Sequence, residues 1–181
     1  MKEKGITIIE LAVVIFIVGL FAVISISDFP KIQKGFALSR TAHKLAQDIK
    51  RAQDLSLSGV RVFEPTYGYG VYLSAGKLEY VIYDDINPSY FGYIIEDNVV
   101  DTIIVDQEKS GVFIKEIVNE VIGNKIGSAV SINFTPPDPI INITDEEENV
   151  YRKIGIILGL KSDSSVSKII WVNTSGLIDV Q

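Results

Sequence analysis

The segment Met1-Lys-Glu-Lys-Gly-Ile-Thr-Ile-Ile-Glu10 opens the chain, and an almost unbroken apolar run follows it as far as Ile26. The 21 residues from Ile6 to Ile26 correspond to about 31 Å of α-helix. This length matches the hydrocarbon core of a bilayer, which is about 30 Å thick. The sequence therefore predicts a transmembrane helix over 6–26, and the positive-inside rule places Lys2 and Lys4 in the cytoplasm.

Glu10 is the only charged residue in this apolar run. A carboxylate inside a membrane span is costly, so such a group usually has a partner or a function. The alternative is a side chain that reaches back to the membrane surface, because Glu10 lies near one end of the span.

The segment Lys4–Leu11 resembles the processing site of type IV prepilins and type II secretion pseudopilins. In that family a short basic leader ends in glycine, a prepilin peptidase cuts after it, and the new N-terminal residue is methylated. A glutamate occupies the fifth mature position. The resemblance implies that Gly5 ends a leader of residues 1–5, that Ile6 is the mature N-terminus, and that Glu10 is the family's glutamate. Ile6 departs from the family pattern, in which phenylalanine or methionine is commoner.

The resemblance also implies roles in assembly. Cleavage would create a free amine at Ile6, and Glu10 of a neighbouring subunit would pair with it in a fibre. Gly19 and Pro30 would allow part of the helix to unwind; the alternative is that Gly19 only permits close packing and Pro30 only bends the helix. The implied partners are the prepilin peptidase, other pilin or pseudopilin subunits, an inner-membrane assembly platform and the lipid bilayer.

Two other interpretations of the N-terminus stay open. A secretory signal peptide could be cut near Ser25-Ile26-Ser27, although the apolar run is long for such a signal and contains an acid. A plain signal anchor of an unrelated β domain would need neither Gly5 nor Glu10.

Residues 27–59 are expected to form an amphipathic continuation of this helix, after an interruption at Ser27-Asp28-Phe29-Pro30. Gly59 is placed to cap its end, and His43, the only histidine, falls among the polar positions and is expected to be solvated. The apolar residues follow helical spacing and form one stripe: Leu38, Ala42, Leu45, Ala46, Ile49, Ala52 and Leu55.

Residues 60–181 read as strands and turns, with hairpins around Ser74-Ala75-Gly76 and Thr174-Ser175-Gly176. The sequence thus predicts an α+β fold in which a long N-terminal helix packs on an antiparallel β domain, the ladle arrangement of pilins. The predicted strands are Tyr67–Leu73, Lys77–Tyr83, Thr102–Asp106, Val112–Val118, Val130–Thr135, Ile140–Thr144, Lys153–Leu160, Lys168–Asn173 and Leu177–Val180.

The β domain is similar to that of the minor pseudopilin H group and its minor-pilin relatives. The resemblance lies in Ala46-x-x-Ile49-x-Arg51-Ala52, Tyr69–Leu73, Tyr80–Asn87, Asn133–Asp138 and Thr174–Gly176. It implies a minor structural subunit of a pilus-like fibre or secretion pseudopilus. The subunit would sit in the inner membrane as a single-pass protein with its β domain outside the cytoplasm, and would then enter the fibre.

Composition argues against other classes of function. The chain has no cysteine and one histidine, and no phosphate-binding loop or nucleophile elbow is visible, so an enzyme, a cofactor and a metal centre are not expected. The net charge of −6 disfavours nucleic acid. A minor pilin that captures DNA remains an alternative, because one basic group lies on the helix: Arg40, Lys44, Lys50 and Arg51.

Three acidic or proline-rich segments are candidates for binding sites. The run Asp145–Glu148 contains four consecutive acids without glycine, which suits a solvated turn better than the closed oxygen shell of a calcium site. Asp84–Pro88 and Pro136–Pro139 are expected to be a turn and a stiff extended loop, respectively.

Overall fold

The structure is a computed structural model that describes residues 5–59, 66–87, 89–90, 92–106, 109–120, 124–137 and 140–181, without the side chains of 24–28. The chain divides into two compact units, Met1–Phe36 and Ala37–Gln181. Lys2 and Lys4, which the predicted leader contains, lie outside the described residues.

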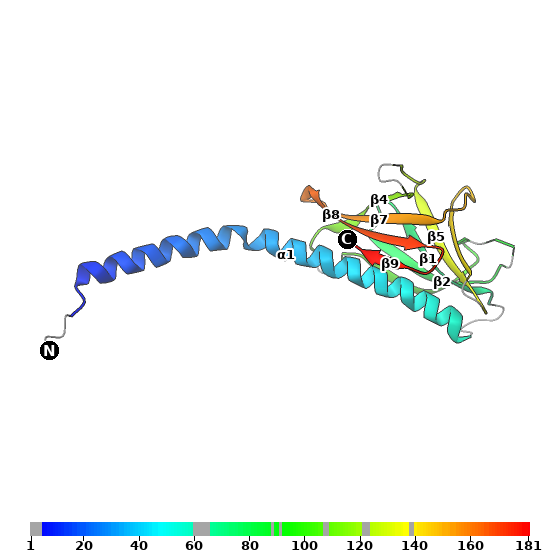
Figure 1. Cartoon of the computed structure of the whole chain (residues 1–181), viewed down its shortest axis with the longest axis horizontal. Helices are drawn as coiled ribbons and strands as arrows, with labels where there is room; N and C mark the ends of the chain where they lie inside the picture. The colour runs from blue at the N-terminus through cyan, green and yellow to red at the C-terminus, as the bar shows by residue number, and fades with distance from the viewer. Residues whose placement is uncertain are drawn as a thin grey trace. The chain divides into compact units, whose positions relative to one another are not determined.

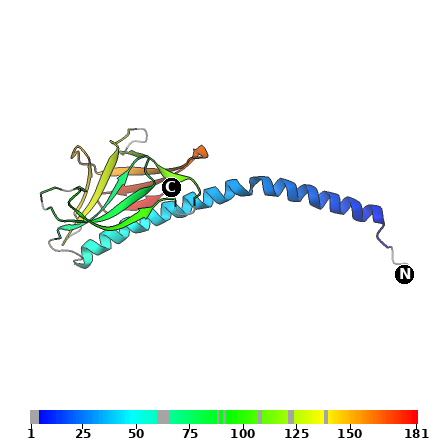
Figure 2. The ribbon, with the colours of Figure 1, turned by 180° about the vertical axis from the view of Figure 1, so that it is seen from behind.

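One helix, α1, runs from Ile8 to Ser58 and is drawn from blue to cyan-green in Figure 2. Pro30 lies inside it, so the predicted interruption at Ser27–Pro30 is wrong. A proline removes one backbone donor, but its fixed φ is compatible with a helix, and helix-forming sequence on both sides can carry the helix across it. Gly59 follows the last helical residue with a φ of 62°, which confirms the predicted left-handed cap.

Within the described side chains, α1 contains no stretch long and apolar enough to count as a membrane span. Ile24, Ser25 and Ile26 belong to the span predicted from the sequence, and their side chains lie outside the described set.

The part of α1 from Ala37 to Ser58 buries one face. Six of the predicted stripe residues are buried, Leu55 is half-buried, and His43 is exposed as expected. This face is fixed by polar contacts to the β domain as well: the Ser56 hydroxyl donates to the carbonyl of Phe134 at 2.5 Å, and the Tyr80 hydroxyl donates to Asp48.

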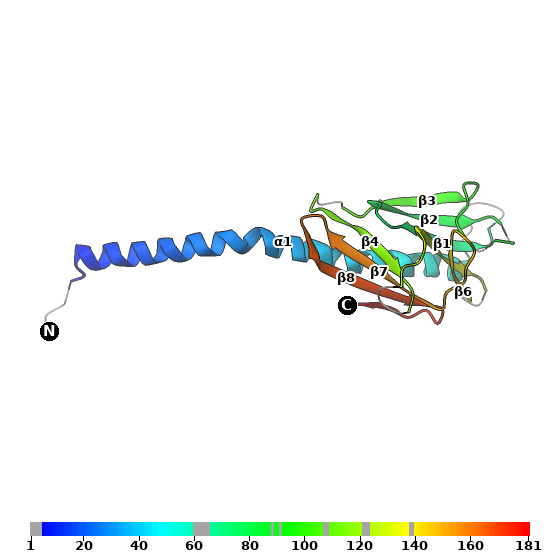
Figure 3. The ribbon, with the colours of Figure 1, turned by 90° about the horizontal axis from the view of Figure 1, so that it is seen from above.

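The β domain consists of two antiparallel sheets (Figure 1). The first has the strand order β3-β2-β1-β5-β6 and the second the order β4-β7-β8-β9; β1, β2 and β3 lie side by side in Figure 3. The strands are β1 Gly68–Ser74, β2 Glu79–Asp85, β3 Asn98–Ile104, β4 Val112–Val118, β5 Ala129–Thr135, β6 Ile140–Asp145, β7 Lys153–Leu160, β8 Asp163–Asn173 and β9 Ile178–Val180.

Both predicted hairpins are present. β1 pairs with β2 across the glycine-containing turn, with Val71 opposite Ile82, and β8 pairs with β9, with Val172 opposite Ile178. The centre of the first sheet is a long-range pairing, since β1 lies between β2 and β5. The protein is therefore α+β, with an N-terminal helix and antiparallel sheets.

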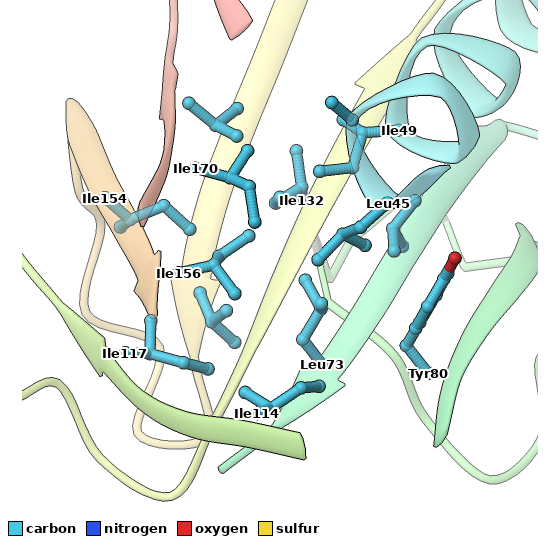
Figure 4. Packing of buried hydrophobic residues seen from close by; sticks show 14 of the residues in the cluster. Leu45, Ile49, Leu73, Tyr80, Ile114, Ile117, Ile132, Ile154, Ile156 and Ile170 are labelled. Carbon is cyan, nitrogen blue, oxygen red and sulfur yellow. The ribbon is translucent and has the colours of Figure 1, made fainter. Parts of the chain in front are cut away.

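One hydrophobic core joins α1 and the inner faces of both sheets. In Figure 4, Leu45 and Ile49 of α1 point toward side chains of both sheets. Because residues of a strand alternate between two faces, every second residue of β7 (Ile154, Ile156, Leu158) enters this core. The labelled strand residues in the view are Leu73, Tyr80, Ile114, Ile117, Ile132, Ile154, Ile156 and Ile170.

Only β4 and β7 have the predicted bounds; five strands differ by one or two residues at one or both ends, and two begin at least four residues earlier than predicted. β3 begins at Asn98, four residues before the predicted start at Thr102, and β8 begins at Asp163 and not at Lys168. Both missed halves contain polar residues with exposed or half-buried side chains, so the apolar signal of a strand is weak there.

Candidate functional site

The segment Gly5-Ile6-Thr7 precedes α1 and is not helical. All three residues are exposed, and the side chain of Ile6 is 81% exposed. The space where Gly5 would carry a Cβ atom is empty within 4 Å. The predicted cleavage site between Gly5 and Ile6 therefore lies in accessible backbone, just before the helix begins.

Thr7 and Glu10 form a capping box at the start of α1. The Glu10 carboxylate accepts hydrogen bonds from the Thr7 backbone N–H and hydroxyl, both at 2.9 Å, and the Glu10 N–H donates to the Thr7 hydroxyl at 3.3 Å. Such a box satisfies two backbone donors that a helix start otherwise leaves unpaired. The sequence reasoning missed this role, although the Thr-x-x-Glu spacing was available as its signal.

The apolar side chains of the first unit are exposed to solvent. They include six consecutive residues from Val13 to Val18, so they surround the helix and do not form a stripe. The exposed residues are Ile6, Ile8, Ile9, Leu11, Val13, Val14, Ile15, Phe16, Ile17, Val18, Leu20, Phe21, Val23, Phe29, Ile32 and Phe36.

Gly19 and Pro30, the predicted points of helix flexibility, both lie within continuous α1. No atom comes within 4 Å of the position that a Cβ of Gly19 would take. In this single chain neither residue interrupts the helix, and their behaviour in a fibre stays a prediction.

The basic group on α1 has carboxylate neighbours. Lys44 Nζ lies 3.9 Å from Asp48 Oδ2, four residues further along the helix, and Arg51 Nη1 lies 2.9 Å from Asp101 Oδ2 on β3. These pairs reduce the positive charge that the group offers to a phosphate backbone.

The acidic run after β6 forms a turn held by Asp145. The Asp145 carboxylate accepts hydrogen bonds from the backbone of Glu147 and Asn149, the Asn149 amide and the Tyr151 hydroxyl. Burial raises the pKa of Asp145, but the bonds from Asn149 and Tyr151 outweigh it and lower that pKa. Among the described residues, no group of three or more histidine, cysteine, aspartate or glutamate side chains is placed to hold a metal ion.

Asp85 and Asp97 fix the turn that follows β2. Asp85 accepts from the Asn133 amide at 2.7 Å and from the Asn87 N–H at 2.9 Å. Asp97 accepts from the N–H groups of Ile86 and Ile94 at 3.3 and 2.8 Å. Burial raises the pKa of both carboxyl groups, that of Asp85 to about 6. Asp84 and Asp85 are the last residues of β2, so the predicted turn over Asp84–Pro88 is wrong at its start; a turn is present from Asp85 to Asn87, and Pro88 lies outside the described residues.

Pro136 and Pro137 form a turn joined by a cis peptide bond, so the predicted extended loop is wrong in its first half. Asp138 and Pro139 lie outside the described residues.

Three features lie in succession at the start of the described chain: an accessible glycine, a capped helix start with its carboxylate, and an exposed apolar helix. No family model matches the chain, and comparisons with curated proteins and with solved structures find no similar protein.

Proposed function

We propose that the chain is a structural subunit of a type IV pilus-like fibre or type II secretion pseudopilus, most similar to the minor H-like subunits. A prepilin peptidase cuts it after Gly5, Ile6 becomes the methylated N-terminus, and the first part of α1 lies in the inner membrane before the subunit enters the fibre.

The register of the N-terminal features carries this proposal. Gly5 lies in non-helical, exposed backbone, α1 begins three residues later, and the only carboxylate of the apolar run projects from the first turn. A peptidase acts on accessible extended backbone, and an assembly residue must lie close to the new terminus. The spacing meets both requirements.

The exposed apolar surface of the first unit supports burial in an assembly. Soluble monomers rarely expose large contiguous apolar patches, so such a surface indicates a partner or a membrane. Here the apolar side chains surround the helix, which suits lipid or a bundle of neighbouring helices. The sequence over 6–26 has the length and the single charge expected of a span that is first inserted in a bilayer.

The antiparallel β domain supports a minor subunit. The resemblance to the H-like group implies an all-β domain behind the helix stripe, and two antiparallel sheets support this part of the proposal. We place the domain outside the cytoplasm because the positive-inside rule keeps Lys2 and Lys4 on the cytoplasmic side.

The capping box indicates how Glu10 would act before assembly. In the single chain, the backbone N–H and the hydroxyl of Thr7 both donate hydrogen bonds to Oε2 of Glu10. Within a fibre, Glu10 would exchange or share these bonds with the amine of Ile6 in a neighbouring subunit, which removes an unpaired positive charge from an apolar bundle.

The test is the mass and N-terminal sequence of protein extracted from membranes of cells with and without a prepilin peptidase. We expect a peptidase-dependent start at Ile6 that is heavier by one methyl group. Gly5→Val should block cutting, and Gly19→Val should not, although both positions have open space for a side chain.

An uncut Met1 in both samples would contradict the proposal and favour a signal anchor. A start near Ser27–Asp28 would contradict it in favour of a cleaved signal peptide. Equal cutting of the Gly5→Val and Gly19→Val variants would remove Gly5 from the recognition site.

A further inference from the structure

A small cavity with tyrosine walls lies over the outer face of the first sheet. Tyr72 of β1 and Ser131 of β5 are direct neighbours in the sheet register. The chain that follows β2 folds back over them: the Tyr93 N–H donates to the Ser131 hydroxyl at 2.9 Å, and the Tyr93 ring centroid lies 4.9 Å from that of Tyr72. Tyr72 of β1 and Tyr93, which follows β2, thus form one wall of the cavity.

Tyr90 completes the lining of the cavity, and Gly92 leaves space for its ring. A Cβ atom on Gly92 would lie 2.7 Å from Cε1 of Tyr90 and 3.0 Å from its Cζ, so only glycine leaves room for the ring in this position. We name the cavity the tyrosine pocket; its volume is about 220 Å³ and its lining is Tyr72, Tyr90, Tyr93, Ala129, Val130, Ser131, Asp145 and Glu146.

The size of the tyrosine pocket limits what can enter it. Pockets for drug-sized molecules usually measure about 300–1,000 Å³. A cavity of about 220 Å³ is smaller and suits the end of a single side chain.

The charged groups that act on Tyr90 in the tyrosine pocket are negative. Burial raises the pKa of Tyr90, and the nearby charges that raise it further are all carboxylates: Glu148, Asp145, Glu146 and Asp97. No lysine or arginine is among the described residues of the lining. The site thus favours a cation that the described part of the chain does not itself supply.

The two carboxylates of the lining differ in what they can offer. Asp145 is occupied by its own turn. Among the described residues, Glu146 accepts hydrogen bonds from two hydroxyl groups, Tyr72 at 3.4 Å and Ser128 at 2.5 Å, and neither donor is basic. A calcium ion would need six to eight oxygen ligands, which aromatic walls do not provide.

We propose that the tyrosine pocket binds an arginine side chain of a partner protein. The planar guanidinium would lie against the tyrosine rings and donate to Glu146, because arginine stacks on aromatic faces and pairs with a carboxylate at the same time. This inference rests on the β domain alone and stands whether or not the chain enters a fibre.

The experiment uses the full-length chain in detergent and an acetylated, amidated Gly-Arg-Gly peptide as the probe. Binding is followed by NMR of the tyrosine ring signals at low ionic strength. We expect saturable binding that shifts the ring signals of Tyr90 and Tyr93, and no saturable binding of the matching citrulline peptide, which has the same shape without the charge.

Variants locate the site. Glu146→Gln and Tyr90→Ala should each weaken binding about three- to tenfold, and Tyr90→Phe should retain it because the ring remains. Glu147→Gln is the matched control: it removes a charge from the same turn, but Glu147 is not part of the lining. Thermal unfolding followed by circular dichroism verifies that each variant is folded.

Three results would overturn the inference. Equal binding of the arginine and citrulline peptides, or an absence of saturable binding, would exclude a cation site. Equal losses in Glu146→Gln and Glu147→Gln would show diffuse attraction to the acidic turn. Calcium binding that Glu146→Gln abolishes would reassign the pocket to a metal.

Discussion

The two parts of α1 on either side of Phe36 use apolar residues in opposite ways. From Ile8 to Val23, apolar side chains surround the helix and are exposed; after Phe36, they form one stripe buried against two sheets. A stripe needs one partner surface, whereas an apolar helix without a polar face needs apolar surroundings on every side. The same helix thus contains a part that the chain's own fold completes and a part that requires something else to cover it.

The largest expected effect comes from replacing Glu10, the only charged residue of the apolar run from Ile6 to Ile26. Glu10→Ala should leave peptidase cutting intact and abolish incorporation into fibres, measured by the amount of the subunit in sheared fibre preparations. Asp54→Ala removes an exposed acid from the second part of the same helix and should not change incorporation.

Glu10→Gln separates the two roles of this residue. Glutamine can still accept from Thr7 in a capping box but carries no charge. Normal incorporation of Glu10→Gln, together with failure of Thr7→Ala, would assign Glu10 to the helix cap and contradict a pairing role.

The second part should be sensitive to the loss of buried volume. Leu45 is fully buried in the core, so Leu45→Ala should lower the free energy of unfolding by about 2–5 kcal/mol. The measurement is denaturant unfolding of the full chain in detergent, followed by fluorescence of Trp171, the only tryptophan. Leu20→Ala, in the first part, should not move this transition; an equal shift in both variants would show that the two parts unfold as one.

The pH dependence of stability also distinguishes exposed from buried carboxylates. Glu10 is exposed, and Asp85 is buried. Burial raises the pKa of Asp85 from 3.8 to about 6, so the native state holds this proton more tightly than the unfolded chain does. The stability that it contributes is complete below about pH 4 and is lost as the pH rises through 6.

Asp85→Asn should therefore flatten the change in unfolding free energy between pH 4 and 6, in the same fluorescence titration. An unaltered slope would show that another group titrates in this range.

The smallest expected difference is between two glycine substitutions, Gly155→Ala and Gly19→Ala. A Cβ on Gly155 would lie 2.9 Å from Cζ3 of Trp171 and 3.0 Å from Cγ2 of Val118, so Gly155→Ala should cost about 1–3 kcal/mol through overpacking. Gly19→Ala meets open space and should leave the thermal unfolding of the β domain unchanged. A stable Gly155→Ala variant would mean that the tryptophan ring moves aside at little cost.

Local patterns predicted what depends on near neighbours. The stripe from Leu38 to Ala52, the cap at Gly59 and both hairpins follow from spacing and turn residues, and they are confirmed. The interruption predicted at Pro30 is wrong because a proline removes one hydrogen bond but does not determine whether the flanking helix tolerates that loss.

The remaining errors concern long-range structure. The first half of β3 is held by pairing with β2, and its Asp101 meets Arg51 from 50 residues earlier in the chain. The tyrosine pocket depends on the register of Tyr72 with Ser131 across β1 and β5. No local window of sequence contains such pairings, whereas the capping box at Thr7 and Glu10 was within reach.

The long-range core also sets an order of events during synthesis. Ile49 of α1 shares its core with Ile156 of β7, about 100 residues further along the chain. At translation rates of roughly 5–20 residues per second, the stripe waits about 5–20 s for the strand that covers it. During that time the nascent chain exposes two apolar helical segments, first the part before Phe36 and then the stripe, and the stripe stays open to other contacts until its strands are made.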